Sequence, residues 1–289
     1  MVRFIVLIAL ALPASAPAQQ TPKPPVREIT QVTGDLYRVR NNNHYTVFYV
    51  TPGGIILADP INADFGAWLK GELAKRFPNA SIRYVIYSHH HQDHASGASV
   101  FNDTADVVGH ENFAAAVKAA APQDKRYAEV MLPESTYRDR RTITLGGRRV
   151  DLVHPGRMGH APDFTVLHFP AERAVFVVDY VAVRTVPGSN TLQNGAPIAE
   201  YVNAIKAVEV LDFDIVMTGH GPNGKKSDLA DHRQYFEHLA ERVTDGIKAG
   251  RSLEELQKAQ IMSEYKGWIE YDEDNDINIA NAYKTLSRP

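Results

Sequence analysis

The sequence predicts an α/β protein in which two β-sheets pack face to face and helices cover their outer faces. Three observations lead to this prediction. Short segments rich in β-branched and aromatic residues recur in two successive parts of the chain, and segments with helical spacing separate them. The chain has 289 residues, of which 44% are apolar and 22% charged, and this is enough for one large domain. No linker rich in glycine, serine or proline divides the chain after its N-terminal segment.

The chain begins with a segment typical of a secretory signal peptide. Arg3 precedes an unbroken apolar run over residues 4–12, and small residues follow up to Ala18. These nine apolar residues are far fewer than the ~20 that a membrane-spanning helix needs. We therefore expect cleavage after Ala18, a secreted or periplasmic location, and no membrane contact afterwards. Residues 19–28 are expected to form a flexible lead-in to a domain over residues 29–289.

The first half of this domain reads as a hairpin-rich sheet. Pro52-Gly53-Gly54 supplies a turn between two apolar segments, so the strands beside it are antiparallel. Apolar residues at helical spacing predict a helix over residues 65–77. The expected strands are residues 36–42, 45–51, 54–60 and 81–89.

The second half repeats the alternation of strands and helices, and a helical tail follows from about residue 226 to residue 289. Strands are expected at residues 107–108, 142–147, 149–155, 165–170, 174–180 and 213–220. Helices are expected at residues 111–120, 198–210, 228–248, 253–259 and 277–286.

Charge and cysteine content limit the chemistry. The chain has 31 lysines and arginines against 34 aspartates and glutamates, a net charge of −3, so nucleic acid is not expected as a partner. It has no cysteine, which excludes disulfides, a thiol nucleophile and thiolate metal ligands. Any metal must therefore be bound through nitrogen and oxygen.

Histidines mark the candidate site. Four of the 12 histidines lie between residues 89 and 94, in the string SHHHQDHASG at the end of an expected strand. His89 and His91 are two residues apart, so their side chains can point the same way. Asp93 and His94 follow at the start of the next helix. A polar turn that only caps a helix has no use for four imidazoles, so this turn predicts ligands for two metal subsites.

The string H-x-H-x-D-H resembles the signature of the metallo-β-lactamase superfamily, and four further segments resemble its other motifs in the family's order. They are IILADP with Asp59, MGHAPDF with His160, FVVDY with Asp179 and VMTGHGP with His220. The resemblance covers essentially the whole chain after the signal peptide. It implies the αββα sandwich of two mixed sheets with helices on the outer faces. It also implies that Asp59 supports the metal loop by hydrogen bonds, and that Asp179 bridges two metals as in glyoxalase-II-like and lactonase-like members.

By this resemblance, the site holds two Zn²⁺ ions per chain and the protein is a zinc-dependent hydrolase. Two zinc ions contribute about +4, and two carboxylates and one bridging hydroxide contribute about −3. The site would therefore keep about +1 of net charge, which can stabilise a developing oxyanion. A metal-bound hydroxide is expected to attack a small ester, lactone or related carbonyl substrate, and Asp93 is expected to orient this nucleophile. The expected ligands are His89, His91 and His160 for one zinc, Asp93, His94 and His220 for the other, and Asp179 between them.

Two other functions remain open. Hydrolysis of β-lactams is not favoured, because the chain lacks the cysteine ligand of some secreted lactamases and has a carboxylate at Asp179. An exported zinc-binding protein that binds a partner without catalysis is also conceivable, although such a role would not require all seven ligands. A small molecule is the expected partner. The sequence leaves the substrate, the oligomeric state and the metal used in vivo open.

The remaining candidates comprise one loop that could contact substrate, several residues with expected structural roles, and a few that stay open. The loop Arg184–Pro197 is long and polar, as substrate loops often are. His110 is expected to lie at the start of a helix, and His90 is expected to support the ligands rather than to bind metal. His232 is expected to be exposed to solvent on a helix of the tail. Ser88 and Ser96 are expected to make hydrogen bonds rather than to attack substrate. Two further groups stay open: His44, which could hang over the site from the first hairpin, and the possible pocket-wall residues Tyr180, Tyr265 and Trp268.

Overall fold

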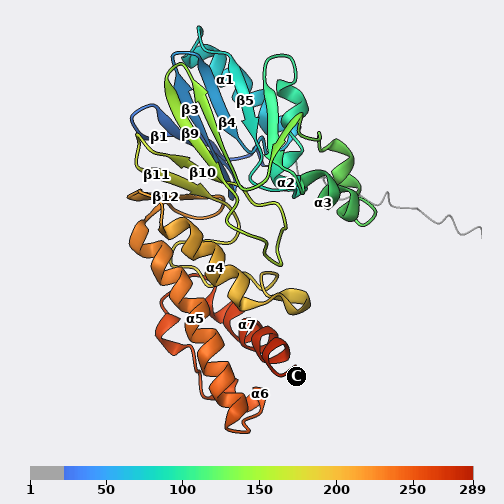
Figure 1. Ribbon diagram of the computed structural model, residues 1–289, viewed down its shortest axis with the longest axis vertical. Helices are drawn as coiled ribbons and strands as arrows, with labels where there is room; N and C mark the ends of the chain where they lie inside the picture. The colour runs from blue at the N-terminus through green and yellow to red at the C-terminus, as the bar shows by residue number, and fades with distance from the viewer. Residues whose placement is uncertain (1–22, 289) are drawn as a thin grey trace, which may run out of the picture.

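The computed structural model describes residues 23–288. The expected signal peptide at residues 1–18 and the first part of the lead-in therefore lie outside the described residues. The described chain forms two mixed β-sheets packed face to face with helices outside, which confirms the predicted fold class (Figure 1). No helix among residues 23–288 is long and apolar enough to span a membrane.

The first sheet has seven strands in sequence order. Its first four strands are antiparallel neighbours, and the last three are added in parallel. The strands are β1 (Arg27–Thr33), β2 (Leu36–Asn41), β3 (His44–Thr51), β4 (Gly54–Ala58), β5 (Ile82–Ile86), β6 (Asp106–His110) and β7 (Ser135–Tyr137). The accompanying helices are α1 (Ala63–Arg76), α2 (Gln92–Ala95), α3 (Phe113–Ala120) and the 3₁₀ turns Ala98–Phe101 and Lys125–Glu129.

The second sheet has six strands in the order β13-β12-β11-β10-β9-β8, and only β11 and β12 are parallel. Its strands are β8 (Arg140–Leu145), β9 (Arg148–Val153), β10 (Val166–Phe169), β11 (Ala174–Val177), β12 (Ile215–Thr218) and β13 (Gly224–Lys225). Helices α4 to α7 gather on one side of the sandwich, in yellow to red in Figure 1. They are α4 (Ile198–Glu209), α5 (Lys226–Lys248), α6 (Leu253–Lys258) and α7 (Tyr271–Leu286), with 3₁₀ turns at Gln193–Gly195 and Ser263–Tyr265.

The core explains why some strands are apolar throughout. In β4, Ile55 and Leu57 pack with α1, whereas Ile56 and Ala58 pack between the two sheets. Side chains alternate along a strand, so a strand that is covered on both faces needs apolar residues at every position. This double cover fixes the ends of the central strands, and the loops at those ends carry the candidate ligands.

Several boundaries and placements differ from the sequence predictions. β1 begins at Arg27, inside the expected lead-in, and α7 begins at Tyr271, six residues before the expected helix. β7 and β13 had no apolar run to predict them. His110 ends strand β6 instead of starting a helix, and it stacks on His154 with ring centroids 4.0 Å apart. His232 is buried rather than solvated, because its ring lies against Phe236 of the next turn of α5 and stacks on Trp268.

Candidate metal centre

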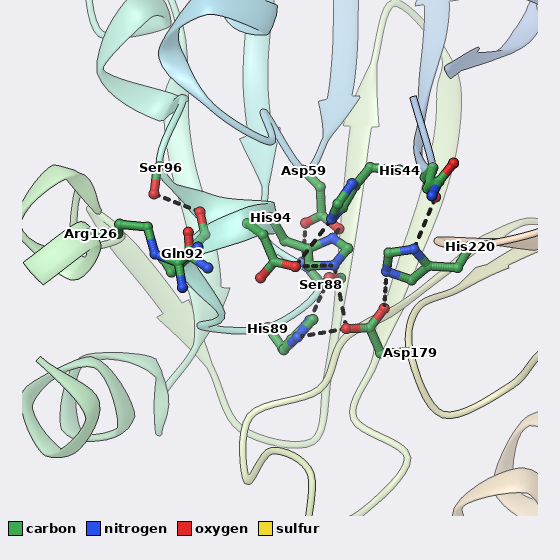
Figure 2. A network of polar contacts seen from close by, with 12 residues as sticks. His44, Asp59, Ser88, His89, Gln92, His94, Ser96, Arg126, Asp179 and His220 are labelled. Carbon is green, nitrogen blue, oxygen red and sulfur yellow. Dashed lines mark hydrogen bonds and ion pairs between the residues drawn. The ribbon is translucent and has the colours of Figure 1, made fainter. Parts of the chain in front are cut away.

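The predicted ligands come together at one end of the sandwich, where loops from both sheets meet (Figure 2). The run from His89 to His94 follows β5, Asp179 follows β11, and His220 follows β12. His160 lies in the loop between β9 and β10. Residues far apart in the sequence therefore share one site because the loops that carry them meet at the same end of the sandwich.

One group of candidate ligands consists of His89, His91, His160 and Asp179, whose ligating atoms all lie within 4.8 Å of one another. Asp179 Oδ2 lies 3.2 Å from His89 Nε2 and 3.3 Å from His160 Nε2. The three histidines of this group are those that the resemblance assigns to the first zinc.

A second group consists of His44, His94 and His220, again with ligating atoms within 4.8 Å of one another. The carboxylate of Asp179 also reaches this group, with Oδ2 3.3 Å from His94 Nε2 and Oδ1 3.1 Å from His220 Nε2. Asp179 therefore contacts both groups, which is the position that a bridging ligand requires.

Asp93, which is expected as a ligand of the second metal, lies beside this second group. Its Oδ2 lies 4.0 Å from His94 Nε2 and 3.1 Å from His44 Nε2, and the compact second group contains His44 instead of Asp93. The sequence alone does not assign His44 to the site, because His44 lies 45 residues before His89 and outside every motif. The only indication in the sequence is its position at a hairpin tip. His44 comes close to His94 and His220 because this hairpin packs on the loop that carries His220.

Neighbouring groups fix the orientation of the imidazoles. His220 Nδ1 lies 3.0 Å from the carbonyl oxygen of Asn43, so Nδ1–H donates and Nε2 is free to bind a metal. Asp59 is fully buried; it accepts a hydrogen bond from Ser88 N at 2.7 Å and lies 3.2 Å from His94 Nδ1. This is the supporting role that the resemblance implies for Asp59.

The two nearby serines and His90 make structural contacts. Ser88 Oγ lies 2.9 Å from His89 Nδ1, and Ser96 Oγ donates to the carbonyl of Gln92 at 2.5 Å. His90 points away from the ligands and pairs with buried Asp163 at 2.8 Å. Neither serine is therefore oriented as a free nucleophile.

Backbone conformation brings Asp179 and the His220 loop into contact. Asp179 has φ 66°, a left-handed conformation that is uncommon for residues other than glycine and is concentrated at functional sites. A Cβ at Gly219 would lie 2.6 Å from a methyl group of Val178. Glycine at this position therefore lets the loop that carries His220 approach the end of β11.

The electrostatics of the cluster favour a cation. Burial would raise the pKa of Asp179, but His94 and the hydrogen bonds from His160 and His220 outweigh it and hold this pKa well below its usual value. Burial lowers the pKa of His89, and it lowers the pKa of His91 to about 2. These two imidazoles are therefore neutral, as metal ligands must be.

The residues fit a metal. His89 Nε2, His94 Nε2 and Asp179 Oδ1 are buried and have no hydrogen-bond partner of good geometry, although each lies within 3.1–3.3 Å of another candidate ligand atom. Orphaned buried polar atoms are costly and call for an explanation such as a bound ion. Imidazole nitrogen and carboxylate oxygen are ligands that zinc accepts. A metal at this position would satisfy the orphaned atoms with their natural ligand chemistry.

A cavity of about 720 Å³ opens over the candidate ligands. The predicted substrate loop lines it through Thr185, Val186, Gly188, Asn190 and Thr191, and the segment Ile269–Glu270 lines it from the C-terminal tail. Tyr180 and Tyr265 are buried in the core, and Trp268 packs edge-on against Tyr265 at 4.8 Å, so these three aromatic residues do not form the cavity wall.

The fold and the ligand geometry define a class of protein. The sequence model of the metallo-beta-lactamase superfamily matches residues 40–220, which is more than half of the chain. The chain belongs to this superfamily, whose members are metal-dependent hydrolases, and it is a metal-dependent hydrolase of this fold. No curated protein matches the sequence closely enough to count as a relative.

Solved structures with the same fold share little sequence with this chain. A metallo-beta-lactamase from Pontibacter korlensis is 18% identical, with a TM-score of 0.62 over 73% of this chain and 99% of that one. The metallo-beta-lactamase FIM-1 from Pseudomonas aeruginosa, in its mono-zinc form, is 17% identical, with a TM-score of 0.61 over 75% of this chain and 97% of that one.

A larger neighbour is the stereoselective inverting sec-alkylsulfatase Pisa1 from Pseudomonas sp., which is 16% identical with a TM-score of 0.71. The match covers 91% of this chain but only 50% of the sulfatase. At these identities the neighbours establish the fold alone.

Proposed function

We propose that the protein is an exported dizinc hydrolase of small, uncharged esters, lactones or related carbonyl compounds. The observation that carries the proposal is the placement of Asp179, whose carboxylate lies 3.1–3.3 Å from the Nε2 atoms of His89, His94, His160 and His220. One carboxylate that reaches two histidine groups supports a dinuclear site.

In this proposal His89, His91 and His160 hold one metal, Asp93, His94 and His220 hold the other, and Asp179 lies between them. Bound zinc lowers the pKa of coordinated water toward ~7 and polarises a substrate oxygen. The chain supplies the remaining functions. Asp93 is half-buried at the edge of the cavity, where it can accept a proton or a hydrogen bond from the attacking water.

The cavity lining supports an uncharged substrate. Among the described lining residues none is lysine or arginine, and Asp93, Asp124, Asp179 and Glu270 supply carboxylates. An anionic sulfate or phosphate ester would meet no lysine or arginine side chain there. Val181, Val186 and Ile269 are apolar lining residues, and the exposed side chain of Ile269 can contact an alkyl or ring portion of the substrate.

A panel of chromogenic substrates tests this proposal. It consists of neutral esters, lactones, the β-lactam nitrocefin, phosphotriesters and anionic sulfate esters of matched chain length, each measured with and without a chelator. We expect neutral esters and lactones to react fastest and the chelator to abolish their turnover.

Three results would contradict the proposal. Faster hydrolysis of nitrocefin would assign the protein to lactam hydrolysis. Faster hydrolysis of anionic esters would contradict the substrate class. No turnover of any substrate by the zinc-loaded protein would favour a role in binding a partner.

A further inference from the structure

His44 lies at the tip of the β2–β3 hairpin, beside the other two residues of the second group, His94 and His220. Its ring centroid is 4.7 Å from that of His220 and 5.6 Å from that of His94. Its Nε2 is 3.1 Å from Oδ2 of Asp93. Figure 2 shows its imidazole among the sticks of the site.

The separation of His44 Nε2 and Asp93 Oδ2 matches that of two neighbouring ligand atoms on one metal ion. Bonds of about 2.0–2.1 Å in a tetrahedral zinc site place neighbouring ligand atoms roughly 3.3 Å apart. The four imidazole contacts of Asp179 are 3.1–3.3 Å long. The 3.1 Å separation of His44 Nε2 and Asp93 Oδ2 is at the lower end of the same range.

The hairpin tip is fixed on the loop that carries His220. On one side of His44, the carbonyl of Asn43 lies 3.0 Å from His220 Nδ1. On the other side, Tyr45 N donates to the carbonyl of Gly219 at 2.8 Å. Because both neighbours of His44 bond to this loop, its imidazole is held near His220 before any metal binds.

Hydrogen bonds to Val26 hold the turn before His44 in place. Asn42 has φ 57°, and its backbone N–H donates to the carbonyl of Val26 at 2.8 Å. Its side-chain oxygen accepts a hydrogen bond from Val26 N at 2.9 Å. These bonds tie the left-handed turn to the segment before β1, so the hairpin tip is an ordered platform for a ligand.

We propose that His44 is a ligand of the second metal subsite, together with His94 and His220. This subsite would then contain three histidines beside the shared carboxylate of Asp179, like the first subsite. Asp93 would complete the shell next to His44. The inference rests on the second metal of the proposed function but not on the identity of the substrate.

A simpler role for His44 would be to donate a hydrogen bond to Asp93. Two variants of nearly equal size separate the roles. Glutamine in His44→Gln can still donate to Asp93 but is a poor zinc ligand. Glutamate in His44→Glu can bind zinc but cannot donate when ionised, and it repels Asp93.

The chain offers a matched control. His238 and Glu264 form a pair with the same 3.1 Å separation, and their side chains are 28% and 41% exposed, against 29% and 41% for His44 and Asp93. The His238 pair lies on the helical tail and does not line the cavity. His238→Gln therefore reports the cost of losing a half-exposed histidine without touching the metal site.

The experiment is zinc content per chain after dialysis against a zinc buffer, with circular dichroism to verify the fold. We expect two ions in the wild type, in His44→Glu and in His238→Gln, and one ion in His44→Gln. The affinity of the second site in His44→Gln should fall more than about 100-fold, because outer hydrogen-bond partners alone cost about 10–100-fold.

Two ions in His44→Gln, or one ion in both His44 variants, would overturn the proposal. Two ions in His44→Gln with one in His44→Glu would assign His44 to hydrogen bonding with Asp93. One ion in the wild type would contradict the dinuclear site itself, and this result is distinguishable because it needs no variant.

Discussion

The cavity has two contrasting sides, which we call the metal floor and the tail wall. The metal floor consists of the histidines and aspartates on the loops after β5, β11 and β12. The tail wall consists of Ile269 and Glu270 together with the lining residues of the preceding loop, which are Thr185, Val186, Gly188, Asn190 and Thr191. In the floor, neighbouring side chains fix one another, and buried Asp59 contacts both Ser88 N and the ring of His94.

The tail wall is held by its backbone instead. Val186 N donates to the carbonyl of Ile269, and Ile269 N donates to the carbonyl of Arg184, each at 2.9 Å. The side chain of Ile269 remains 57% exposed. A wall that is fixed through its backbone can change its side chains without losing its shape. We infer that the floor determines the reaction and the wall determines which substrate is bound.

The largest effect is expected at the centre of the floor. Asp179→Ala should weaken both metals together and lower kcat/KM by more than about 100-fold, because even outer partners of metal ligands cost about 10–100-fold. His220→Ala should weaken mainly the second metal. Metal titration of both variants measures this difference. Full metal content and activity in Asp179→Ala would contradict a bridging role.

On the wall side, His232 links helix α5 to Trp268, and burial lowers its pKa to about 4. In the unfolded chain its pKa is about 6.5. Below pH 6.5 the unfolded state therefore gains a proton that the folded state does not. Stability present above pH 6.5 is lost as the pH falls toward 4, by at most about 3 kcal/mol.

His232→Leu should flatten this part of the pH dependence. Urea unfolding of the chelator-treated protein at pH 7 and pH 4.5 measures it, with His238→Leu as the control on the same helix. An equal loss of stability with falling pH in the wild type and His232→Leu would show that His232 does not carry this effect.

The support beneath the floor gives a smaller effect. Asp59→Ala leaves Ser88 N and the ring of His94 without their acceptor, so the second metal should bind about 10–100-fold more weakly. Isothermal titration with zinc measures this change. The exposed carboxylate of Asp212, which pairs with Arg173 at 2.6 Å, provides the control variant Asp212→Ala. Unchanged zinc affinity in Asp59→Ala would contradict the supporting role.

The smallest effect is expected on the tail wall. Ile269→Ala should lower kcat/KM for esters with a long alkyl chain roughly fivefold, equivalent to about 1 kcal/mol for partial burial of this side chain. It should leave metal content and the hydrolysis of acetate esters unchanged. Steady-state kinetics with both esters decide the point. Equal losses for the two esters would place Ile269 outside the binding surface.

The sequence predicts the floor better than the wall for a physical reason. Ligands such as His89 and His94 follow a strand in one short motif, so local pattern and chemistry are enough to find them. His44 lies in a different hairpin, and only the docking of that hairpin on the His220 loop brings it to the site. Ile269 reaches the cavity through a backbone pairing with residue 185 that no side-chain pattern encodes.

The same limit applies to the fold. Strands such as β4, which are covered on both faces, have continuous apolar runs and were found in the sequence. β13 has only two residues, Gly224 and Lys225, and pairs at the edge of the second sheet, so it carries no such signal. Local sequence thus identifies elements that bury side chains, whereas elements fixed by backbone pairing need the assembled structure.

The most direct test of this account is the metal content of the purified wild-type protein, measured by elemental analysis and native mass spectrometry. A dinuclear site predicts about two zinc ions per folded chain, because Asp179 joins two groups of histidine ligands. One ion per chain, or a site filled mainly by iron, would contradict it.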